Sequence, residues 1–116
     1  MIANMGHNAD DIIKLVSVLQ EIAGSFPADP KELTEGHLED LKNDYAQHSK
    51  PSPSTFKRRI IGLLSVAMVI AGRVATATDF ANNVLELSNK LEVPISEIQP
   101  QLETLKYALP ELNWHS

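Results

Sequence analysis

Three consecutive basic residues, Lys57, Arg58 and Arg59, form the only cluster of positive charge in the chain. Adjacent cations of this kind suit an anion, a nucleic acid, a lipid headgroup or an acidic partner. An intramolecular role is the alternative, because three acidic residues lie only one linker away, namely Glu35, Glu39 and Asp40. Surface ion pairs of this type are common and contribute little to stability. We expect the intramolecular role.

Metal-binding and catalytic patterns are the next candidates. Asp40, Asp44 and His48 follow each other at steps of four, so a helix would align them on one face, but a further strong metal ligand is missing. The chain has no cysteine, which removes thiolate zinc sites and cysteine nucleophiles. It also has no Gly-x-Ser-x-Gly, phosphate-loop or His-Glu-x-x-His motif. We expect no catalytic residue, no metal, no cofactor and no enzymatic activity.

The net charge of −5 falls entirely within residues 1–50, while the rest of the chain is neutral overall. An acidic protein is a poor non-specific binder of nucleic acid, since each phosphate contact needs a cation. We therefore expect no nucleic-acid partner. The N-terminus lacks a basic stretch leading into an apolar one, which predicts no signal peptide and a cytoplasmic location.

Helices must position these residues, and apolar spacing predicts five of them. The first begins at Asn8 and ends at Gly24 in a left-handed turn. Its apolar stripe starts at Ile12 and continues past the helix end to Phe26. The second begins at Asp29, which would cap a helix with Pro30 in its first position, and runs to about residue 47. It is mostly polar, with a narrow apolar edge formed by Leu33, Leu38, Leu41 and Tyr45.

The third helix is predicted at about 56–73 and is apolar on nearly every side. Such a helix lies in the centre of a core or in a membrane. The apolar run at 60–71 has 12 residues, against the roughly 20 that a spanning helix needs, so we expect the core and no membrane partner. One strip of small residues would let a neighbouring backbone approach closely: Gly62, Ser65 and Gly72.

The fourth helix follows a break at 76–79 and continues to Pro94, and the fifth runs from Pro100 to Pro110. Both carry more apolar residues than one stripe requires. Leftover apolar surface of this kind commonly marks an interface. We therefore predict a homodimer whose interface includes Ala81, Leu85 and Tyr107.

Together these elements predict an all-α fold, a compact bundle of about five helices around the apolar helix at 56–73. Residues 1–116 are expected to form one domain, in which 48–54 is a Pro/Ser linker and 1–7 and 115–116 are frayed. Trp114 is expected to cap the core.

The order of these segments resembles a group of small helical domains common in cyanobacteria. The likeness covers about residues 8–95 and lies in the stretch from His37-Leu-Glu-Asp-Leu, through the Pro-Ser-Pro linker and Lys57-Arg58-Arg59, to the segment from Thr76 to Leu87. Domains of that group occur alone or beside pentapeptide-repeat, TIR or NACHT-type modules. The resemblance implies an adaptor-like or effector-associated module and carries over no catalytic residue.

The expected function is therefore a non-catalytic helical module for protein–protein interaction or oligomerisation, with another protein or a second copy as partner. The alternative is a peripheral membrane or anion-binding protein that uses Lys57, Arg58 and Arg59.

Overall fold

The computed structural model describes residues 2–46 and 53–112, which form five α-helices and one short 3₁₀ turn without any strand. The elements are α1 (Ile2–Ala23), α2 (Ala28–Ala46), α3 (Pro53–Ile70), α4 (Ala77–Lys90), η1 (Ile95–Glu97) and α5 (Gln99–Ala108). This confirms the predicted all-α bundle. Most of the predicted linker, Trp114 and the segment 115–116 lie outside the described residues.

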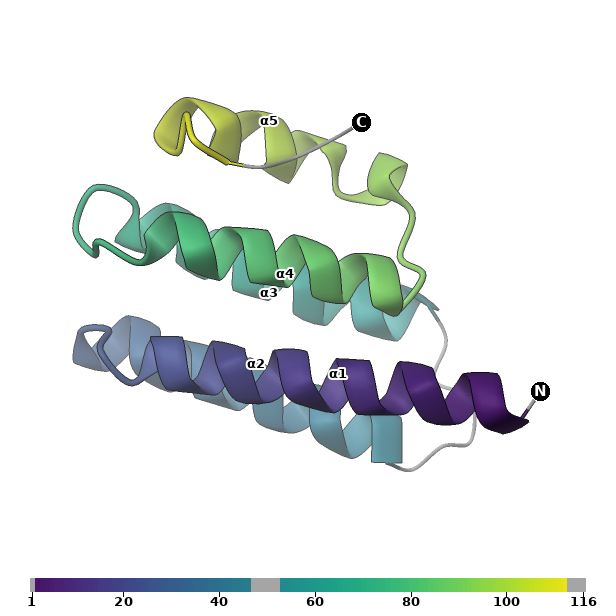
Figure 1. Cartoon of the computed structure of the whole chain (residues 1–116). Coiled ribbons are helices and arrows are strands. Elements are labelled where there is room, and N and C mark those ends of the chain that lie inside the picture. The colour runs from purple at the N-terminus through teal and green to yellow at the C-terminus, as the bar shows by residue number, and fades with distance from the viewer. Residues whose placement is uncertain (1, 47–52, 113–116) are drawn as a thin grey trace.

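The first four helices pack in a closed ring, in the order α1, α2, α3, α4 and back to α1. They run alternately in opposite directions, with α3 and α4 forming one layer and α1 and α2 the layer beneath it (Figure 1). α5 lies on the outer side of the upper layer and packs against α3 (Figure 1). Short connections between consecutive helices favour this antiparallel arrangement.

The apolar positions of α3 form the middle of the core. Five apolar residues of this helix are fully buried: Ile60, Leu63, Leu64, Ala67 and Ile70. They belong to one continuous cluster with buried residues of the other helices. At its edge the ring of Phe26 meets Phe80 edge-on, with centroids 5.1 Å apart. The prediction for the α3 core is confirmed.

α3 packs against three helices, α2, α4 and α5, rather than the four expected neighbours. The ring explains the difference, because it places α1 diagonally opposite α3. One side of α3 therefore faces solvent and exposes Ser65, Met68 and Val69. In the described part of the chain, no helix combines the length and apolarity needed to cross a bilayer.

Two residues expected at an exposed interface are instead part of the core. Ala81 is fully buried and Leu85 is 9% exposed. α4 has two neighbours, α1 and α3, and needs a second apolar stripe for the second contact. Their assignment to an intermolecular interface was therefore wrong. Tyr107 on α5, the third residue of that group, is 91% exposed.

The ends of α1 and α2 differ from the prediction. α1 begins at Ile2 instead of Asn8. Gly24 is not left-handed: its N–H donates to the carbonyls of Gln20 and Glu21 and continues a right-handed turn. Asp29 lies inside the first turn of α2, where its charge still favours the helix dipole.

Left-handed residues end α3 and α4 earlier than expected. Gly72, at φ 79°, stops α3 at Ile70. Glu92, at φ 62°, follows the end of α4 at Lys90. There the N–H of Val93 donates to Ser88 and that of Glu92 to Asn89, which is the Schellman pattern of a helix end. α3 also starts within the predicted linker, at Pro53, since proline is tolerated in a first helical turn.

Truncation of a core residue of α3 should destabilise the bundle strongly. Leu64→Ala is expected to lower the free energy of unfolding by about 2–5 kcal/mol, because it removes buried methyl groups and leaves a cavity. The neighbouring Ser65→Ala is the matched control: its side chain is exposed, so a change within about 0.5 kcal/mol is expected. Chemical denaturation measures both. Equal midpoints for Leu64→Ala and the wild type would contradict the core assignment.

Candidate functional site

The structure separates the three basic residues of the predicted cluster. The ammonium of Lys57 pairs with Glu97 Oε1 of η1 at 2.8 Å. Arg59 turns toward α2 and pairs with Asp40 Oδ2 at 3.4 Å. Arg58 is exposed and makes no ion pair within the described residues. The expected contact with the acidic second helix is therefore present at Asp40, and the cluster does not present one cationic surface.

The guanidinium of Arg59 also reaches Asp44, one turn further along α2. Its Nε lies 3.8 Å from Asp44 Oδ2, and both of these atoms are buried without a hydrogen-bond partner. Their attraction is therefore electrostatic, at a distance too long for a hydrogen bond. Asp40 and Asp44, two of the three residues weighed above as metal ligands, both pair with this arginine. His48, the third, lies outside the described residues.

The imidazole of His37 on α2 lies directly against Gly62 on α3. A Cβ at position 62 would come within 2.5 Å of the imidazole ring, so only glycine leaves room for it. At Gly62, the strip of small residues therefore contacts the side chain of His37 rather than a neighbouring backbone as expected. Burial lowers the pKa of His37, the nearby charge of Arg59 lowers it further, and Asp40 partly opposes both.

Beside His37, an apolar groove of about 220 Å³ separates α2 from α3. We refer to it as the α2–α3 groove. Its α2 wall consists of Asp29, Pro30, Leu33 and His37. Its α3 wall consists of Gly62, Ser65, Val66 and Val69. Leu33 is 57% exposed and Val69 is 51% exposed, so two large apolar side chains face solvent across the same groove.

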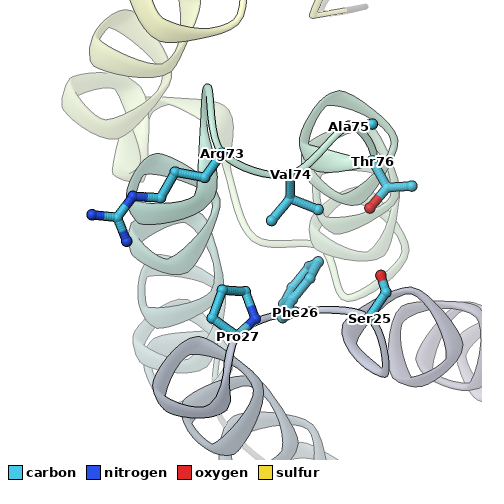
Figure 2. Close-up of a pocket in the computed structure, with 7 residues that line it drawn as sticks. All are labelled: Ser25, Phe26, Pro27, Arg73, Val74, Ala75 and Thr76. Carbon is cyan, nitrogen blue, oxygen red and sulfur yellow. The ribbon is translucent and has the colours of Figure 1, made fainter.

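A second hollow, of about 510 Å³, lies at one end of the bundle between the α1–α2 and α3–α4 connections (Figure 2). Its polar groups do not converge. The Arg73 guanidinium points away from Thr76 (Figure 2), and the Ser25 hydroxyl donates to the carbonyl of Ile22 at 3.0 Å. The Thr76 hydroxyl oxygen is buried without a hydrogen-bond partner. This hollow lacks a set of groups that could act together on one ligand.

The described residues contain no group of three metal-ligating side chains. The α2–α3 groove is lined mainly by apolar side chains, and Asp29 is the charged residue in its lining. Sequence reasoning missed this groove because it placed Leu33 on one apolar edge with Leu38 and Leu41, whereas Leu33 is exposed and those two are buried. No family model, curated protein or solved structure matches this chain.

The contact between His37 and Gly62 makes a comparison of two glycines informative. Gly36→Ala on α2 should raise the free energy of unfolding by about 0.5–1 kcal/mol, because alanine favours helix and a Cβ there meets nothing. Gly62→Ala should raise the free energy of unfolding by less than this, or lower it, because the imidazole of His37 must move to make room for the new Cβ. In the His37→Ala variant the imidazole is absent, so adding Gly62→Ala to that variant should again raise the free energy of unfolding. Equal effects of the two glycine substitutions would contradict the packing of His37.

The lowered pKa of His37 predicts a pH dependence of stability. The folded protein favours the neutral imidazole. The stability that this preference provides is therefore fully present above the ordinary pKa of about 6.5 and is lost as the pH falls below it. His37→Gln should remove this part of the slope. Denaturation of both proteins between about pH 5 and pH 7.5 measures the difference, with the other histidines acting equally in each. Parallel pH profiles for the two proteins would refute the effect.

Proposed function

We propose that this chain is a non-catalytic helical module that acts by binding protein, including a second copy of itself. The observation that carries the proposal is the α2–α3 groove, where Leu33 and Val69 are each more than half exposed on one surface. Placing two such side chains in water is unfavourable by roughly 25 cal/mol for each Å² of apolar area that a partner could cover. Binding to a protein surface would remove this apolar area from water.

The charged groups support binding rather than chemistry. Lys57 and Arg59 are held in ion pairs with carboxylates of the same chain. A catalytic site would instead need polar groups converging on a cavity with shifted pKa values. The pKa of His37 is lowered, but burial of the imidazole is the largest cause, and the ring packs against Gly62. An adaptor role beside effector modules, as the family resemblance implies, is consistent with this proposal.

Light scattering coupled to size exclusion tests the proposal. The mass should exceed the 12.8 kDa of one chain at micromolar concentration and should fall toward that value on dilution. A mass that stays at 12.8 kDa across a hundredfold dilution series would exclude self-association.

Sedimentation with anionic vesicles separates the proposal from the membrane-binding alternative. We expect the protein to remain in the supernatant at low salt, because Lys57 and Arg59 are already paired and the chain is acidic. Binding that increases with anionic lipid and decreases with salt would favour the alternative.

A further inference from the structure

We propose that the α2–α3 groove is the surface on which a second copy of this chain docks, in a twofold pairing that sets α2 of each copy against α3 of the other. This inference rests on the proposed function and specifies where self-association occurs. It replaces the surface on α4 and α5, since Ala81 and Leu85 are buried within one chain.

The apolar centre of the surface is Leu33 on one wall and Val69 on the other. Val66, which is 3% exposed, and the buried Pro30 form the floor between them. Two further exposed apolar residues, Ile13 and Val18, do not form such a pair, because they are five positions apart on α1 and so point to different sides of that helix.

The charges beside the groove have opposite signs on its two walls. The α2 wall carries Asp29, with the exposed Glu32 nearby, and α3 is flanked by Arg58 and Arg73. All four side chains are exposed, and within residues 2–46 and 53–112 none of them has an ion-pair partner. The surface therefore offers unpaired acid on one side of an apolar strip and unpaired base on the other.

Asp29 and Arg73 lie at the same end of the groove. Asp29 lines the groove together with Val69, near the end of α3. Arg73 follows α3 and lines the end hollow together with Pro27, which immediately precedes α2 (Figure 2). The antiparallel course of α2 and α3 thus brings an acid and a base to matching levels on the two walls (Figure 1).

A twofold axis along the groove makes this surface complementary to itself. This rotation places the α2 wall of one copy over the α3 wall of the other and leaves each residue at the same position along the groove. Leu33 of one copy therefore faces Val69 of the other, and Asp29 faces Arg73. Each contact occurs twice. An axis across the groove would instead place α2 against α2 and oppose like charges, which is unfavourable. The acidic α2 wall likewise disfavours an anionic membrane as the occupant.

Charge reversal tests the pairing directly. Asp29→Arg alone and Arg73→Asp alone should each raise the dissociation constant of the dimer by about tenfold or more, because like charges then face each other twice. An equimolar mixture of the two variants should associate again, since the introduced arginine of one copy then meets the introduced aspartate of the other. Analytical ultracentrifugation at low salt measures all three samples. Folding effects within one chain do not predict recovery on mixing.

The apolar centre has a matched control. Leu33→Glu should raise the dissociation constant by about tenfold or more, because a charge replaces an apolar contact. Tyr107→Glu changes an even more exposed residue on α5 and should leave it unchanged. Circular dichroism confirms that each variant is folded.

The outcomes distinguish the two proposals. A wild-type chain that is monomeric throughout overturns self-association and with it this surface. A wild-type dimer that is insensitive to Leu33→Glu and to both charge reversals overturns only the surface assignment. Loss of association in Tyr107→Glu alone would place the interface on α5, and reversals that weaken the dimer without recovery on mixing would refute the twofold pairing.

Discussion

The contact between α2 and α3 joins two helices of unequal character. α3 is apolar nearly all round, whereas α2 is the most polar helix of the bundle. Without disulfides, packing must hold these helices together, and α2 has too few apolar residues to cover its side of α3 completely. Leu38 and Leu41 are fully buried and Tyr45 packs against Phe56, but other contacts along this interface are the imidazole of His37 on Gly62 and the ion pairs of Arg59 with two carboxylates. The groove is the space that this mismatch leaves.

Much of the core follows from residue spacing alone. The 3.6-residue period identifies the buried face of α3, because burial there depends mainly on being apolar and on the correct side. The same reasoning fails for Ala81 and Leu85, since the number of neighbours that α4 has is a property of the assembled ring. Helix ends are equally difficult. Residue type predicts a left-handed glycine, yet Gly24 is right-handed and the glutamate at 92 is left-handed.

The candidate site was less predictable than the core. Lys57, Arg58 and Arg59 are adjacent in sequence, but consecutive residues on a helix point about 100° apart, so they reach different neighbours. Lys57 meets Glu97 from a distant segment, which no local pattern indicates. Val69 illustrates the opposite case. Its residue type predicts burial, and only the position of α2 relative to α3 leaves it half exposed.

The uneven charge of the chain connects the fold with the proposed pairing. The acidic first half contains α2, and Arg59 of α3 lies across from it. On the inner side of this contact, Arg59 meets Asp40 and Asp44 within one chain, and its side chain is only 28% exposed. On the outer side, Asp29 and Arg73 are exposed. Salt screens exposed charges far more than partly buried ones, so rising salt should weaken the pairing of two copies well before it weakens the contact that holds α2 to α3.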